Sequence, residues 1–98
     1  MSDELTVEHE DGGAHGRYVI RLDGGLEAEM TYRRIAPGAI AIDHTYTPPE
    51  YRGRNIAATL MNHAIADARS SGHRIQPVCS YVVAQFHRHP EWSDLLHG

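Results

Sequence analysis

Two arginines flank a glycine in the segment Tyr51–Ala57, between an apolar run at residues 39–47 and a helical pattern. In that pattern, apolar residues recur at the spacing of one helix face: Ile56, Leu60, Met61, Ala64, Ile65 and Ala68. The first N–H groups of a helix have no acceptor within the helix, and the helix dipole favours an anion there. Arginine side chains beside such a turn favour phosphate. The segment therefore predicts a phosphate-binding turn between a strand and a helix.

The single cysteine, Cys79, directly precedes Ser80, which we expect to cap a second helix. The start of a helix favours a thiolate, so Cys79 is a candidate reactive thiol. The alternative is a small buried residue at the end of a strand, because free cysteine is among the most buried residue types. The local sequence leaves both interpretations open.

His44 lies near the end of the run at residues 39–47. Imidazole titrates near neutral pH, so His44 could act as a general base, for example toward Cys79. A histidine on the strand surface with no chemical role is the alternative. His87 and His89 resemble a pair of metal ligands, but a zinc site needs three or four convergent ligands. We therefore expect no metal.

The composition is that of one globular domain spanning residues 1–98, with 41% apolar and 22% charged residues. The net charge of −4 argues against nucleic acid as a partner. The chain has neither a secretory signal nor an apolar run near the ~20 residues that a membrane-spanning helix needs, so we expect no membrane partner. A single cysteine fits a reducing compartment. Together these features predict a cytoplasmic protein.

The order of elements predicts a mixed α/β fold. Four antiparallel strands are expected at residues 5–9, 16–22, 26–35 and 39–47. A helix at 53–69 follows, with Gly72 as its stop, and then a strand at 74–78, which Pro77 assigns to a sheet edge. A short helix at 81–87 precedes a final turn at 91–96 that turns Trp92, Leu95 and Leu96 inward. The strands on either side of the long helix form a right-handed β-α-β crossover if they are parallel.

Three segments resemble the Gcn5-related N-acetyltransferase (GNAT) superfamily. Residues 52–57 resemble its acyl-coenzyme A pyrophosphate loop, Gln/Arg-x-x-Gly-x-Gly/Ala, with Arg52 first, Ala57 last and Asn55 in place of the middle glycine. Asparagine tolerates the left-handed backbone that glycine adopts there. The segments 77–81 and 86–92 resemble those of a small single-domain GNAT-like subgroup, the YjdJ-type predicted acetyltransferases.

This resemblance implies a GNAT-like α/β (α+β) core: a mostly antiparallel mixed sheet, a long helix after the fourth strand and a short C-terminal helix. It implies acetyl-coenzyme A as co-substrate and acetyl transfer to an amine that the sequence does not identify. Catalytic roles then fall to Cys79 and His44. Coenzyme A contacts fall to Thr45, Tyr46, Thr47, Arg52, Gly53, Arg54, Asn55, Ile56 and Ala57.

Two other functions are compatible with the sequence. A coenzyme A-binding regulatory or interaction module with little catalysis is the main alternative, because the short chain lacks later strands that could build an acceptor pocket. A Cys–His hydrolase would need a third, orienting group, and we can name none. The oligomeric state is left open by the sequence.

Overall fold

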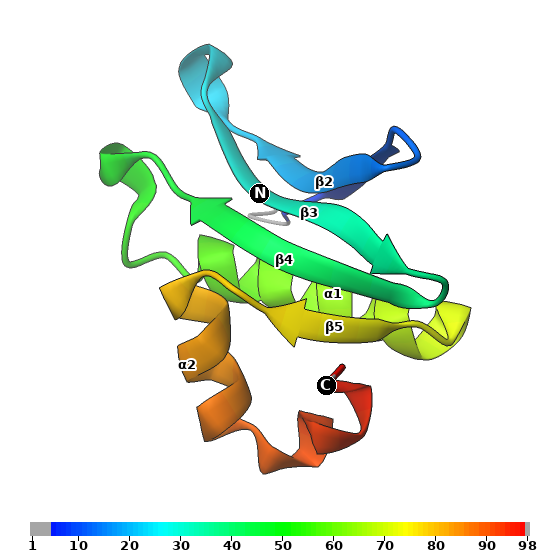
Figure 1. The fold of residues 1–98 in the computed structure, drawn as a ribbon. Coiled ribbons are helices and arrows are strands. Elements are labelled where there is room, and N and C mark those ends of the chain that lie inside the picture. The colour runs from blue at the N-terminus through cyan, green and yellow to red at the C-terminus, as the bar shows by residue number, and fades with distance from the viewer. Residues whose placement is uncertain (1–4, 98) are drawn as a thin grey trace.

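The computed structural model describes residues 5–97, so residues 1–4 and 98 of the expected domain lie outside the described range. One five-stranded sheet has the order β1 (Val7–Asp11), β2 (His15–Arg21), β3 (Glu27–Ala36), β4 (Ala39–Tyr46) and β5 (Arg74–Pro77) (Figure 1). The first four strands pair antiparallel, and β5 pairs parallel to β4. The predicted meander is confirmed, and the parallel pairing of β4 with β5 meets the condition set for the crossover.

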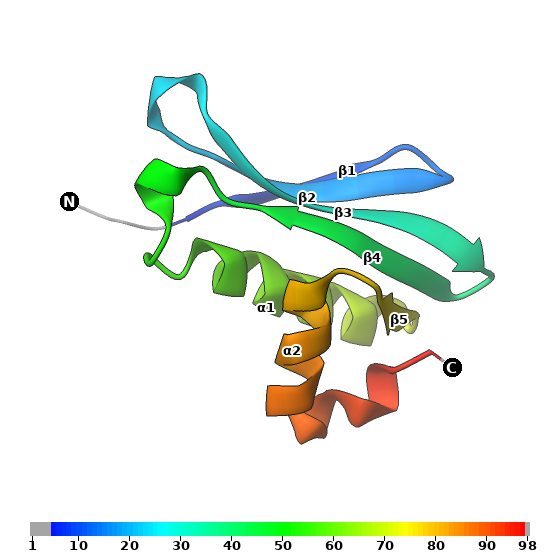
Figure 2. The same ribbon diagram turned by 60° about the vertical axis from the view of Figure 1, so that its left-hand side comes forward.

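The helices lie on one face of this sheet. The long helix α1 (Ile56–Ser71) runs beneath the strands, and α2 (Ser80–Arg88) lies near β5 on the same side (Figure 2). Short 3-10 turns, η1 (Asp23–Gly25), η2 (Pro49–Tyr51) and η3 (Pro90–Leu95), complete the described chain. The result is a two-layer α/β fold in which no described helix covers the other sheet face.

Alternation along β3 explains which face of the sheet is covered. Ala28, Met30 and Tyr32 are buried against the helical layer, while Glu29 and Thr31 between them point to the open face. The six apolar positions of α1 that were predicted to share one face are all buried: Ile56, Leu60, Met61, Ala64, Ile65 and Ala68. Periodicity in the sequence therefore identified the core correctly.

The start of α1 differs from the expectation. The helix was expected from Gly53 but begins at Ile56, because Gly53 (φ 82°) and Asn55 (φ 62°) have left-handed backbones that a helix interior excludes. Gly72 ends the helix as predicted, with φ 77° and its N–H donating to the carbonyl of Ala68 at 2.9 Å.

Two expectations for the C-terminal third were wrong in detail. Ser80 is the first helical residue of α2 and Cys79 occupies the N-cap, because the carbonyl of Cys79 already accepts the Val83 N–H at 3.0 Å. Leu96 does not turn inward: it is 38% exposed and forms a β-bridge with Ile75, along the outer side of β5. The β5 strand is an edge strand of the sheet, as Pro77 indicated.

Charged side chains cover the open sheet face. Arg17 contacts Glu10 at 2.7 Å, and Glu27 and Glu29 at 2.9 Å each. Its hydrogen bonds lower the pKa of the Glu10 and Glu27 carboxyls below their ordinary value, and these carboxylates in turn raise the pKa of Arg17. A second arginine, Arg21, contacts Glu8, Glu10 and Glu27. Ionic contacts therefore connect β1, β2 and β3 on the sheet face that no described helix covers.

Among residues 5–97, no helix is both long enough and apolar enough to span a membrane.

Candidate functional site

The parallel pair β4 and β5 separates at the end where the candidate residues lie. Their register ends at Ile42 and Pro77, and the carbonyl of Ile42 accepts the N–H groups of both Val78 (3.1 Å) and Cys79 (3.2 Å). β4 nevertheless continues beside β3 as far as Tyr46. Residues 43–46 consequently have no strand partner on their β5 side within the described chain, and their backbone is open to a ligand on that side.

A β-bulge at this opening decides which way β4 side chains point. Tyr32 pairs with Ile42 but Thr31 pairs with His44, so Asp43 is the extra residue. The Thr31 hydroxyl donates to the Asp43 carboxylate at 2.7 Å. Because Thr31 points to the open face, its partner His44 also belongs to that face, where it is exposed.

Thr45, the next residue, points to the helical side and meets the cysteine. Its Oγ1 atom lies 3.4 Å from Sγ of Cys79, which is half-buried at the start of α2. No hydrogen bond of the described chain joins His44 to Cys79, and the two candidates flank β4 from opposite sides. The structure therefore brings Cys79 together with Thr45, a side-chain contact that the sequence did not indicate.

The turn before α1 keeps its backbone donors free. The first bond across the helix start is Thr59 N–H to the Asn55 carbonyl, at 3.0 Å, which leaves the N–H groups of Ile56, Ala57 and Ala58 without acceptors in the helix. The Asn55 side chain does not cap them. Three donors are thus directed at one place, where the dipole of a 16-residue helix favours an anion.

A cavity of about 400 Å³ lies over this turn. Its walls consist of Thr47, Tyr51, Arg52, Gly53, Asn55, Ile56, Ala57, Ala58, Tyr81, Gln85 and Arg88. No carboxylate is among these residues. The Arg52 Nε donates to the Thr47 carbonyl at 3.1 Å, and the Thr47 hydroxyl oxygen is buried with no hydrogen-bond partner among the described residues. We refer to this hollow as the loop cavity.

Helix α2 supplies one wall of the loop cavity, which the sequence did not predict. Tyr81, Gln85 and Arg88 stand at positions i, i+4 and i+7, on one helix face. Tyr81 is half-buried: it packs against the hydrophobic core and also lines this wall, and burial raises the pKa of its hydroxyl. Arg54 does not line the cavity, since its guanidinium lies over the Tyr51 ring at 5.2 Å.

Comparison with known proteins identifies the family of this chain. Residues 17–95 match the family described as GCN5-related N-acetyl-transferase. The chain belongs to this family. It is 28% identical to Protein NATD1 of Danio rerio over 101 aligned positions, which cover 99% of this chain and 90% of that protein. The solution structure of a GCN5-like candidate N-acetyltransferase from Staphylococcus aureus superposes with a TM-score of 0.65, at 25% identity, covering 93% of this chain and 88% of that one.

The residues of this GNAT member fit the pyrophosphate of an acyl-coenzyme A. Free N–H groups, the unpartnered Thr47 hydroxyl and Arg52 are the donors that such a group needs. A side chain built on Gly53 would meet nothing within 4 Å, so the space over the turn is open. Asn55 already has the left-handed backbone of the glycine that it replaces.

The histidines of the C-terminal segment have structural contacts. His89 Nδ1 lies 2.9 Å from Glu91 Oε2, and its ring stacks on Trp92 at 4.0 Å. Trp92 is buried against Phe86 with a ring separation of 5.5 Å, which confirms its predicted place in the core. Within residues 5–97, no set of three or more His, Cys, Asp or Glu side chains is arranged to hold a metal ion.

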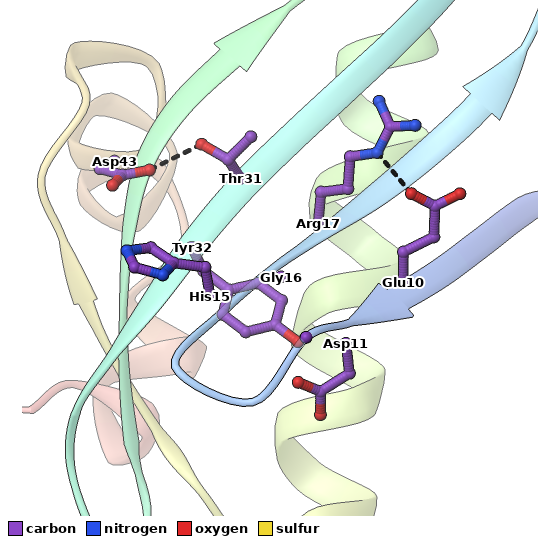
Figure 3. A pocket seen from close by; sticks show the side chains of 9 residues that line it. Glu10, Asp11, His15, Gly16, Arg17, Thr31, Tyr32 and Asp43 are labelled. Atoms are coloured by element: carbon purple, nitrogen blue, oxygen red, sulfur yellow. Dashed lines mark hydrogen bonds and ion pairs between the residues drawn. The ribbon is translucent and has the colours of Figure 1, made fainter.

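A second hollow, of about 590 Å³, lies on the open sheet face (Figure 3). It is lined by Glu10, Asp11, Gly12, His15, Gly16, Arg17, Thr31, Tyr32 and Asp43. The bonds from Arg17 to Glu10 and from Thr31 to Asp43 lie along its walls. This open-face hollow reaches the bulge residue beside His44, so it borders the β4–β5 opening from the side opposite the cysteine.

Proposed function

We propose that this GNAT member is an N-acetyltransferase that uses acetyl-coenzyme A. The observation that carries the proposal is the loop cavity: backbone donors, Arg52 and Arg88 converge there with no carboxylate in its walls. A site of this composition is suited to a polyanion, and in a GNAT fold the expected polyanion is the phosphate portion of coenzyme A.

The coenzyme would bind along a path that runs from the turn before α1 to the gap between β4 and β5. The N–H groups of Ile56 to Ala58, the Arg52 guanidinium and the Thr47 hydroxyl would hold the pyrophosphate. The pantetheine arm would lie beside residues 43–46, whose backbone faces the gap left by β5. Tyr46 and Val78, 41% and 45% exposed, offer apolar surface on the two sides of this gap.

The reaction is acyl transfer with a defined proton path. The amine nitrogen forms a bond to the acyl carbon, the carbon–sulfur bond breaks, and coenzyme A leaves as a thiol. His44, or water, takes the proton that the amine loses, and an N–H of the open β4 edge stabilises the developing oxyanion. Cys79, held beside Thr45, returns a proton to the leaving sulfur. The amine would approach His44 across the open-face hollow.

Titration calorimetry with acetyl-coenzyme A tests the binding half of the proposal. Wild type should bind, and Arg52→Ala should bind about tenfold more weakly, because a charge-assisted bond to phosphate is lost. Arg74→Ala removes an exposed arginine at the far end of β5 and should bind like wild type. Lack of binding by the wild type would overturn the proposal.

Transfer to a panel of primary amines, followed by thiol release, tests the catalytic half. We expect His44→Gln to have a lower turnover than wild type and an unchanged affinity for acetyl-coenzyme A. Binding without transfer to any amine would instead make the chain a coenzyme A-binding module.

The role of Cys79 is tested separately by mass. Intact protein incubated with acetyl-coenzyme A alone should gain no acetyl group if Cys79 is a proton donor. An acetyl adduct that Cys79→Ser abolishes would show the two-step covalent route instead.

A further inference from the structure

In the described part of the chain, five arginines form no ion pair with a carboxylate, and two of them line the loop cavity. Within residues 5–97, four arginines are bound to carboxylates in ion pairs: Arg17, Arg21, Arg34 and Arg69. Arg52 and Arg88 form no ion pair with a described carboxylate, and both line the loop cavity. Each of these two guanidiniums therefore has donors available for a ligand.

The two arginines that line that cavity come from different elements of the fold. Arg52 is part of the turn before α1, and its Nε is already bonded to the Thr47 carbonyl. Arg88 belongs to the last turn of α2 and shares the helix face of Gln85. The turn by itself offers three N–H groups and one arginine, which suffice for a pyrophosphate. Arg88 is an additional charge that comes from a separate element.

A cation in the last turn of a helix is also favoured by the helix dipole. That effect does not explain the position of Arg88. His87 is in the same turn and is exposed, yet it does not line the loop cavity, whereas Arg88 does. The last turn of α2 therefore places the permanently charged Arg88, and not His87, at the loop cavity.

We propose that Arg88, assisted by the amide of Gln85, forms a second phosphate subsite that recognises the 3′-phosphate of coenzyme A. This inference rests on the proposed function, and it makes a prediction that the function alone does not. The protein should select coenzyme A over dephospho-coenzyme A, which has the same pyrophosphate and pantetheine but lacks the 3′-phosphate. A guanidinium offers that phosphate a paired set of N–H donors.

Calorimetric titration of both ligands at low salt tests the subsite. For wild type we expect dephospho-coenzyme A to bind at least about tenfold more weakly than coenzyme A. Arg88→Ala should weaken the binding of coenzyme A to that same level and leave the binding of dephospho-coenzyme A unchanged. The ratio of the two dissociation constants should therefore approach one. Arg88→Lys keeps the charge without the paired donors and should retain part of the ratio.

Two matched variants control for loss of charge. Arg52→Ala should weaken the binding of both ligands by the same factor and keep the ratio of their dissociation constants, because the pyrophosphate that Arg52 contacts is common to both. Arg74→Ala removes an exposed arginine elsewhere and should change neither ligand. Unliganded melting temperatures of all variants show that each one is folded.

The outcomes separate this inference from the proposed function. If wild type binds both ligands equally well, the subsite is overturned and coenzyme A binding stands. If Arg74→Ala lowers the ratio as much as Arg88→Ala does, the selectivity reflects overall charge, and the subsite is overturned as well. If wild type binds neither ligand, the proposed function fails together with the subsite.

Discussion

The Oγ1 atom of Thr45 lies 3.4 Å from the Sγ atom of Cys79, and this contact joins the open end of β4 to the start of α2. It holds the thiol on the helical side of β4, while His44 lies on the open side. Two titratable groups thus border the β4–β5 opening from its two faces. In the proposed transfer, the amine nitrogen would lose its proton on the His44 side, and the leaving sulfur would gain one on the Cys79 side.

Replacing Thr45 with valine removes the hydroxyl and keeps the shape of the side chain. If Cys79 acts through this position, Thr45→Val should lower the transfer rate about tenfold, because the loss of one oriented hydrogen bond has roughly that effect. Thr45→Ser should restore most of the rate. Steady-state kinetics and a melting curve are the measurements. A loss of stability with an unchanged kcat would limit Thr45 to a packing role.

Asn55 can be exchanged for glycine without strain, because its backbone is already left-handed at φ 62°. Asn55→Gly should bind acetyl-coenzyme A no more weakly than wild type and keep its melting temperature. Asn55→Val should lose about 1–2 kcal/mol of stability, since a β-branched residue is poorly tolerated in this conformation. Calorimetry and thermal denaturation provide the comparison. Much weaker binding by Asn55→Gly would show that the asparagine side chain itself contacts the ligand.

Acid should loosen the ionic contacts of the open sheet face. Hydrogen bonds from Arg17 lower the pKa of Glu10 and Glu27 in the fold, so their stabilisation is complete above the ordinary value of 4.5 and is lost as the pH falls below it. Melting temperatures should therefore drop between about pH 5 and pH 3, and less steeply in Arg17→Gln. Arg33→Gln, which removes an arginine with no described ion pair, is the control. An equal slope in all three proteins would contradict the assignment.

His73 should make stability depend on pH in a higher range. Burial lowers its pKa below the ordinary 6.5, and its Nε2 atom is buried with no partner among residues 5–97. The unfolded chain therefore binds the proton more readily, and the contribution of His73, complete above pH 6.5, is lost as the pH falls. His73→Gln should flatten the decline below pH 6.5 in a urea titration series. The exposed His15, changed to Gln, should leave that decline as it is in wild type.

Most of the fold could be predicted because its signals are local. Alternation in β3 and the helical spacing from Ile56 to Ala68 identified the core faces, and Gly72 marked the helix end. The boundaries that were wrong depend on tertiary geometry. Gly53 and Asn55, at the loop cavity, adopt left-handed backbones. Both residue types tolerate this conformation, but the sequence does not show that they adopt it here.

The candidate site was only partly accessible to sequence reasoning. The turn at the loop cavity could be predicted as a phosphate site because its residues are contiguous, from Arg52 to Ala57. The wall formed by Gln85 and Arg88 was missed because it depends on how α2 packs against the turn. The bulge at Asp43 likewise carries no local signature, yet it decides which sheet face His44 and Thr45 each point to.

The bridge between Leu96 and Ile75 has a consequence for association between copies of this protein. It covers the outer side of β5, where the His97 N–H also donates to the Ile75 carbonyl at 2.9 Å. At the other margin of the sheet, β1 presents the carboxylates of Glu8 and Glu10. Charge and coverage are two devices by which proteins keep exposed strands from pairing with another chain. Removal of the residues after Leu95 would therefore uncover the outer edge of β5 and favour intermolecular β-pairing and aggregation.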